Sequence, residues 1–348
     1  MKRQNHSSEG PPGHGGPPGE TRTVLVDGVR QVYRIAGRGP LCLVHSGGPG
    51  VHPEYLRMPG LEHGLTLVHL DPVGAGDSDR LPDGDYSPSR YARHAAAVLD
   101  DLGAPRAYLL GHSHGGFVAL QFALDLPDRL DGLILYDTAP TNGPDQREAA
   151  TKEMAAFVAR WPDRPEAAAA GRMWDAVNVT RTLAVTDDAS ALRYLSGILP
   201  AYFADHRRTA ALRGGSLALR VTHDPNRLPA PWDVRDRLGA IDVPALVIVG
   251  AHDFICPPRF ARALHAGIPD ARLVELPDSG HFGHLEQPDE FTAAVLAFVR
   301  DRGHDHRTDD ATCDTTDRVA DRVTDRPSDL SGRLSGRRDT DHETGTQG

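Results

Sequence analysis

The segment Gly111-His112-Ser113-His114-Gly115 restricts the possible folds more than any other part of this sequence. It has the spacing Gly-x-Ser-x-Gly, it follows the apolar run Ala107-Leu110, and a helical pattern begins at Gly116. Glycines at this spacing allow a sharp turn from a strand into a helix, which holds the serine hydroxyl above a sheet near the positive end of the helix. The segment therefore predicts a reactive Ser113 at the end of a strand.

Short runs rich in β-branched residues or leucine alternate with amphipathic stretches along the chain. The predicted strands are Thr23-Val26, Gln31-Ile35, Leu41-His45, Leu65-Leu70, Ala107-Leu110, Leu133-Tyr136, Ala245-Val249 and Arg272-Leu276. The predicted helices between and after them are Pro88-Leu102, Gly116-Leu126, Pro258-Ala266 and Pro288-Val299. The first two strands join around Asp27-Gly28, which predicts a hairpin. Near-continuous apolar strands separated by helices imply an α/β fold, a mostly parallel twisted sheet with helices on both faces.

One long interval, residues 139–237, contains helical patterns and no strong strand. The helical patterns are Arg147-Arg160, Ala167-Val177 and Ala189-Phe203. Roughly a hundred residues exceed the usual connection between two strands. We therefore predict a helical cap inserted into a core that is formed by residues 21–138 and 238–300.

The two ends of the chain differ in composition from its middle. Residues 1–20 are mostly Gly, Pro and polar residues, and residues 301–348 are mostly Asp, Arg, Thr, Ser and Gly. Such segments bury too little apolar surface to offset their ordering entropy. We expect a disordered leader and a disordered tail.

Charge, cysteine content and hydropathy limit the cellular compartment and the binding partners that we expect for this chain. With a net charge of -10 and a pI near 6.0, the chain is not expected to bind nucleic acid or an anionic membrane, which need a basic surface. Cys42, Cys256 and Cys313 are too few and too far apart for a disulfide framework or a zinc site. The sequence has no signal-peptide pattern and no run near the ~18 apolar residues of a membrane span. We expect a cytoplasmic protein that needs no metal or organic cofactor and acts on a small molecule or a short peptide; the sequence predicts no oligomeric state.

A reactive serine needs a general base, and the base needs an acid that orients it. Asp253 follows the predicted strand Ala245-Val249, and His281 follows the next one. The carboxyl ends of parallel strands gather at one edge of a sheet, so side chains placed there can meet. Ser113, His281 and Asp253 are the predicted catalytic residues, with His284 as the alternative base.

The negative oxygen that forms on an attacked carbonyl needs backbone N–H donors. One donor is predicted at His114, directly after the nucleophile. The other is predicted in the Gly-rich segment Ser46-Gly50, which follows the third strand. We predict Gly48 as this second donor, with Gly47 as the alternative.

These residues resemble a known family. The chain from Thr21 to Arg300 resembles the α/β-hydrolase superfamily and, within it, the prolyl aminopeptidase (proline iminopeptidase) family. The resemblance rests on four segments: Gly47-Gly48-Pro49-Gly50, Asp71 through Ser78, the turn around Ser113, and Ser279-Gly280-His281. The resemblance implies an α/β-hydrolase fold and hydrolysis through an acyl-enzyme on Ser113. Its most specific implication is an aminopeptidase-like activity on small peptides or amino-acid amides.

The sequence departs from the peptidase pattern at the part of the cap that binds the substrate amine. The peptidases carry a Glu shortly before His-Tyr-Phe; the matching segment here is Ile198-Phe203, with Leu199 in place of the Glu. A buried ammonium without a carboxylate loses its compensation for desolvation, so Asp175, Asp205 or Glu153 would have to replace that Glu. The alternatives are an ester, lactone or C–C bond hydrolase of secondary metabolism, or a non-catalytic binding protein with this fold.

Overall fold

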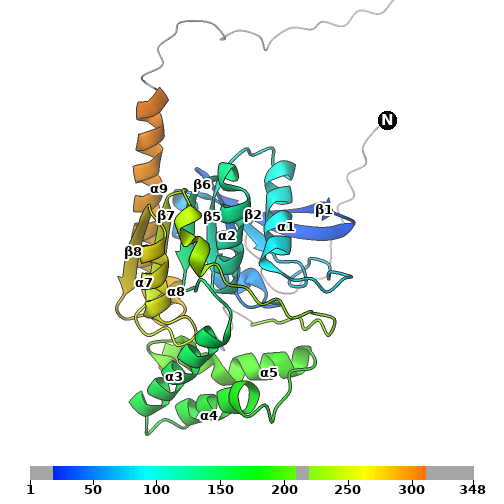
Figure 1. The fold of residues 1–348 in the computed structure, drawn as a ribbon, viewed down its shortest axis with the longest axis vertical. Helices are drawn as coiled ribbons and strands as arrows, with labels where there is room; N and C mark the ends of the chain where they lie inside the picture. Colours follow the sequence, from blue (N-terminus) through cyan, green and yellow to red (C-terminus); the bar gives the residue numbers. More distant parts are fainter. Residues whose placement is uncertain (1–18, 209–218, 311–348) are drawn as a thin grey trace, which may run out of the picture. The chain divides into compact units, whose positions relative to one another are not determined.

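The computed structural model describes residues 19–208 and 219–310, which form an eight-stranded sheet covered by helices (Figure 1). The strands are β1 (Glu20–Val26), β2 (Val29–Gly37), β3 (Leu41–His45), β4 (Thr66–Asp71), β5 (Ala107–His112), β6 (Leu130–Tyr136), β7 (Ala245–Gly250) and β8 (Ala271–Leu276). All eight predicted strands are confirmed, with boundaries shifted by a few residues. Their order in the sheet is β1-β2-β4-β3-β5-β6-β7-β8.

The pairing of the strands makes the sheet mostly parallel, as predicted. β1 and β2 form an antiparallel hairpin whose turn residues Asp27 and Gly28 have φ angles of 52° and 80°, the backbone that a two-residue hairpin turn of type I′ requires. β2 also pairs antiparallel with β4, and every later pair is parallel. The carboxyl ends of β3, β5, β6, β7 and β8 therefore lie along one edge of the sheet.

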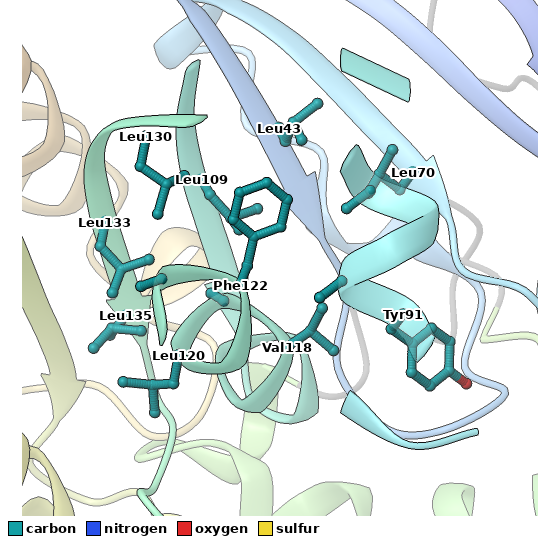
Figure 2. Close-up of a cluster of buried hydrophobic side chains, with 14 of the residues drawn as sticks. Leu43, Leu70, Tyr91, Leu109, Val118, Leu120, Phe122, Leu130, Leu133 and Leu135 are labelled. Carbon is teal, nitrogen blue, oxygen red and sulfur yellow. The ribbon is translucent and has the colours of Figure 1, made fainter. Parts of the chain in front are cut away.

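Alternate residues of the central strands bury themselves on opposite faces of the sheet. On one face, Leu109 and Leu133 pack with α1 (Pro88–Asp101), α2 (His114–Asp125) and α7 (Pro258–Gly267), and Figure 2 shows much of this cluster. On the other face, Leu110 and Ile134 pack with the first part of α9 (Pro288–Asp310). Burial on both faces explains why these strands are almost continuously apolar.

Helix α9 is longer than the sequence indicated. The predicted tail begins at residue 301, but α9 continues to Asp310. Two ion pairs tie its extension to the core: Asp301 pairs with Arg272 at 2.5 Å, and Arg302 pairs with Asp270 at 2.8 Å. The prediction weighed only apolar burial and overlooked these charges. The predicted leader ends one residue too late, since Glu20 opens β1; residues 1–18 and 311–348, with Cys313, lie outside the described residues.

The segment between β6 and β7 contains the three helices that were expected in residues 139–237. They are α3 (Pro144–Arg160), α4 (Pro165–Trp174), which continues as the π-helix η4 (Asp175–Val179), and α5 (Asp188–Ile198). They lie side by side in Figure 1 and share an apolar cluster with Phe254, just after β7. No helix within the described ranges is long and apolar enough to cross a membrane.

Short helices complete the described parts of the chain. They are η1 (Pro53–Leu56), η2 (Leu61–His63), η3 (Pro127–Arg129), η5 (Leu199–Tyr202), η6 (His206–Arg208), η8 (Arg235–Ala240) and α8 (Gly283–Glu286).

Candidate active site

Ser113 occupies the turn between β5 and α2 in a backbone conformation that few residues other than glycine adopt. Its φ is 54° and its ψ is -119°, and strain of this kind persists only where the surroundings enforce it. The turn is held by a bond from the Ser113 N–H to the Tyr136 carbonyl at 2.9 Å. A Cβ on Gly111 would collide with the Gly115 carbonyl, and one on Gly115 with the His45 carbonyl. The glycines of the motif thus let α2 approach the strands closely enough to present Ser113.

His281 and Asp253 form a buried pair at the ends of β8 and β7. The Nδ1 atom of His281 lies 2.8 Å from Oδ2 of Asp253, and both residues are 2% exposed. The other carboxylate oxygen, Oδ1, accepts the N–H groups of Ile255 at 2.9 Å and Cys256 at 3.0 Å. Those bonds fix the carboxylate, which in turn orients the imidazole. His281 and Ser113 line the same small cavity of about 60 Å³.

The alternative base, His284, has both ring nitrogens engaged. Its Nδ1 lies 2.9 Å from the Tyr136 hydroxyl, and its Nε2 lies 2.8 Å from the Tyr55 carbonyl. The carbonyl can only accept, so Nε2 carries the proton and Nδ1 accepts from the hydroxyl. Burial lowers the pKa of His284 to about 4, which keeps this ring neutral. The geometry therefore favours His281 as the base.

The two candidate donors for a substrate oxygen flank Ser113. His114 is the first residue of α2, where a helix offers N–H groups without an intrahelical partner. Gly48, with φ of 50°, lines two cavities together with Ser113. The N–H of Gly47 already donates to the Tyr55 hydroxyl at 2.7 Å. This bond favours Gly48 over Gly47 as the second donor.

A buried chain of hydrogen bonds joins the site loops, and the sequence did not reveal it. The Tyr55 hydroxyl accepts from Gly47 and lies 2.7 Å from Nδ1 of His112, whose Nε2 lies 2.9 Å from the His281 carbonyl. The carbonyl accepts, so Nε2 of His112 donates and Nδ1 accepts from Tyr55. Burial, followed by the neighbouring His281 and His284, lowers the pKa of His112 well below its ordinary range. His112 thus acts as a neutral connector between three loops.

Asp137 is a second carboxyl group at the site that the sequence pattern did not reveal. It follows β6, it is fully buried, and its φ is 46°. Its Oδ1 accepts the Gly250 N–H at 2.8 Å. Burial, and then repulsion from Asp253, raise its pKa well above the ordinary range, so we infer that it is a neutral acid. Its place directly after a strand, like that of Asp253, was an available signal.

One group of metal-binding residue types occurs among the described residues. Ligand atoms of His112, Asp137 and His281 lie within 4.8 Å of one another. Both nitrogens of His112 have hydrogen-bond partners, and Nδ1 of His281 is bonded to Asp253. A metal ion would have to displace bonds that hold the site together, so these residues fit a hydrogen-bonded centre better than a metal site.

Ser113 also opens into a larger cavity of about 440 Å³ under the segment between β6 and β7. Its apolar lining includes Phe117, Tyr202, Leu228 and Ile255. Neither this cavity nor the small one at Ser113 has an Asp or Glu among its described lining residues, and Leu199 lines the small one.

None of the acids suggested as amine ligands lines these two cavities. Asp205 pairs with Arg207 at 2.6 Å, Asp175 is exposed, and Glu153 is half-buried on α3. The two cavities that Ser113 lines therefore have no described carboxylate for a substrate ammonium; Asp224 lines the adjoining cavity of about 350 Å³.

Comparison with known proteins places this fold among hydrolases. A family model described as the alpha/beta hydrolase fold matches residues 39–288. The chain is 29% identical over 284 residues to a 2-hydroxymuconate semialdehyde hydrolase of Pseudomonas putida, covering 80% of this chain and 93% of that protein. It is 25% identical over 294 residues to a proline iminopeptidase of Saccharolobus solfataricus, covering 77% and 87%. A solved alpha/beta fold family hydrolase from Bacillus anthracis has a TM-score of 0.62 over 80% of this chain and 99% of that chain; at 20% identity this is a likeness of fold.

Proposed function

The chain belongs to the α/β-hydrolase fold family, and from this membership we propose that it is a serine hydrolase of small acyl compounds. The bond it cleaves is an ester, a lactone or a C–C bond next to a carbonyl. The observation that carries this proposal is the opening of Ser113, beside the His281–Asp253 pair, into cavities without a described carboxylate.

The proposed reaction uses the side chains in two steps. Nε2 of His281 takes the proton of Ser113 while its oxygen attacks the substrate carbonyl, and the N–H groups of Gly48 and His114 bind the resulting oxyanion. The protonated His281 then gives its proton to the leaving group, which leaves an acyl-enzyme. Water activated by His281 attacks the acyl group, and Ser113 leaves as the hydroxyl. Asp253 holds the imidazole in the required tautomer throughout.

The cavity lining supports acyl compounds over peptide N-termini. An ammonium that enters a buried cavity without an opposite charge costs several kcal/mol. Leu199 stands where the resemblance to the aminopeptidases requires a Glu, and it faces the small cavity at Ser113. The relative from Pseudomonas putida, named for the hydrolysis of a semialdehyde, supports a C–C bond as one of the targets. In this proposal, residues 139–237 act as a cap that shapes the cavity.

The nucleophile is tested by active-site labelling. We expect a fluorophosphonate probe to label the full chain, and Ser113→Ala to abolish labelling and lower kcat on a p-nitrophenyl ester by about a thousandfold or more. The measurement is in-gel fluorescence together with ester kinetics. Unlabelled wild-type protein with a native melting temperature would contradict the proposal.

The same preparation tests the substrate class. p-Nitrophenyl esters and proline or alanine β-naphthylamides are compared at equal concentration, with Ser113→Ala as the blank. Hydrolysis of esters with no arylamide activity is the expected result. Faster hydrolysis of the arylamides would favour the aminopeptidase alternative.

A further inference from the structure

Arg227 is a cation in the wall of the large Ser113 cavity. It belongs to the extended segment between residue 219 and η8, and it lines both the 440 Å³ cavity and an adjoining one of about 350 Å³. Its guanidinium carbon lies 3.9 Å from the ring centroid of Tyr86, and its Nη1 donates to the Tyr91 hydroxyl at 3.3 Å. These contacts hold the guanidinium in one place.

The charge of this guanidinium has no direct counter-ion in the described structure. Its Nη2 is buried and has no hydrogen-bond partner, and no carboxylate oxygen among residues 19–208 and 219–302 lies within 4.0 Å of it to form an ion pair. The nearby Asp224 uses its two oxygens for the Tyr86 hydroxyl at 2.6 Å and the Asn226 N–H at 2.9 Å. A buried, unpaired guanidinium nitrogen is costly unless a ligand supplies its partner.

We propose that Arg227 binds a carboxylate of the substrate, so that the natural substrates are small acyl compounds that carry a second, free carboxylate. The proposal rests on the function proposed above, since the acyl group must reach Ser113 in the same cavity. A free carboxylate on the substrate is a feature that neither the fold family nor the residues Ser113, His281 and Asp253 determine.

The chemistry of the cavity favours one carboxylate over a phosphate. Arg227 is the only Lys or Arg among the described residues lining the 440 Å³ cavity. The one histidine among the described lining residues, His114, is neutral, because burial, His45 and Arg227 itself lower its pKa to about 3. One guanidinium in the cavity wall matches the single charge of a carboxylate, whereas a phosphate would leave about one negative charge unpaired. The apolar walls then accept the carbon chain between the carboxylate and the reacting carbonyl.

The test compares two esters of similar length, one charged and one neutral. p-Nitrophenyl hemiglutarate carries a free carboxylate, and p-nitrophenyl hexanoate carries none. We expect wild-type kcat/KM to favour the hemiglutarate, and Arg227→Met to lower the ratio of the two values by about tenfold or more, an amount typical of one charged contact. Arg227→Lys, which keeps the charge without the planar fork, should restore part of the ratio. The control is Arg262→Met, which removes an equal charge from a side chain 60% exposed and paired with Glu275.

A binding measurement separates this proposal from the proposed hydrolysis. In Ser113→Ala, glutarate should raise the melting temperature and glutaramide should not, and adding Arg227→Met should remove the glutarate effect. An unchanged ester ratio in Arg227→Met, with labelling intact, overturns the carboxylate site and leaves the serine hydrolase in place. If glutarate binds through Arg227 but no fluorophosphonate labels the wild-type chain, the proposed serine hydrolase is wrong and the carboxylate site stands.

Discussion

At the scale of single residues, two buried carboxyl groups compete for the role of orienting His281. Asp253 bonds the imidazole directly, and its other oxygen is held by two backbone N–H groups. Asp137 has a pKa raised well above the ordinary range, mainly by burial. A neutral acid cannot stabilise an imidazolium as a carboxylate does. The electrostatics therefore favour Asp253 as the orienting acid, and they leave Asp137 a structural role, in which its Oδ1 accepts the Gly250 N–H.

Substituting each carboxyl by its amide separates the two roles. Asp253→Asn should lower kcat by about 10⁴-fold, because the amide favours the wrong tautomer of His281. Asp137→Asn should lower kcat by less than about tenfold, because an amide can replace the accepting oxygen and the donating group of a neutral acid. Ester kinetics over pH 5 to 9 measure both effects. Equal losses of kcat in the two variants would contradict this assignment of roles.

At the scale of elements, the site depends on how closely α2 approaches β3. The carbonyls of His45 and Ser46, at the end of β3, lie against Gly115 in the first turn of α2. On the other side of α2, Gly116 lies against Thr138, whose hydroxyl donates to the Ser113 carbonyl at 2.7 Å. Backbone packed against backbone cannot move aside as a flexible side chain can. The position of Ser113 is therefore set by the contact between a helix and a strand.

Adding one methyl group at this contact should disrupt both folding and activity. In Gly115→Ala the new Cβ would collide with the His45 carbonyl and lie 2.8 Å from the Ser46 carbonyl oxygen. We expect a loss of about 3 kcal/mol in the free energy of unfolding, together with weaker labelling of Ser113. Urea titration and probe labelling measure the two effects.

Gly239→Ala is the matched control, because nothing lies within 4 Å of a Cβ there. Its free energy of unfolding should stay within about 0.5 kcal/mol of the wild type. Equal stability of both variants would show that α2 does not need the close approach.

At the scale of the whole molecule, burial of neutral histidines links folding to pH. Burial is the main cause that lowers the pKa of several histidines to about 4 or below; they are His45, His69, His94, His114 and His284. Their ordinary pKa is 6.5. As pH falls below that value, the unfolded chain binds protons that the folded protein does not, so stability falls. The loss extends from about pH 6.5 down to the depressed values.

His94 offers a test away from the proposed active site. It lies on α1, it is 1% exposed, and neither ring nitrogen has a hydrogen-bond partner in the described structure. His94→Leu should raise the free energy of unfolding at pH 7 by on the order of 1 kcal/mol, because it removes unsatisfied buried polar atoms. The gain should be larger at pH 5, because the depressed pKa of His94 no longer opposes folding.

Urea titrations at pH 7 and pH 5 measure this prediction. His63→Leu is the control, because His63 is exposed, and its effect should stay within about 0.5 kcal/mol. A gain from His94→Leu that is equal at both pH values would mean that His94 contributes nothing to the acid sensitivity.

The sequence alone determined the features that depend on local chemistry. Runs of apolar or β-branched residues predicted all eight strands. The signal has a clear cause in β3, β4, β5, β6 and β7, because a strand buried on both faces must be apolar along its length. The glycines around Ser113 predicted the sharp turn, and the order of Ser113, Asp253 and His281 at strand ends predicted which side chains would meet. The end of α9 was misjudged, because the ion pairs of Asp301 and Arg302 involve partners about thirty residues away.

Only the tertiary structure decided the features that depend on distant neighbours. His281 and His284 are alike in sequence, and their partners Asp253 and Tyr55 separate them. Asp137 belongs to the site because the folded chain buries it near Asp253, and this burial raises its pKa. Arg227 became a candidate ligand because Tyr86, far away in the chain, holds it in the wall of the Ser113 cavity. Hydrogen bonds and desolvation act over a few ångströms in space, whatever the separation along the chain, so the fold and not the sequence pattern decides which substrate this serine can reach.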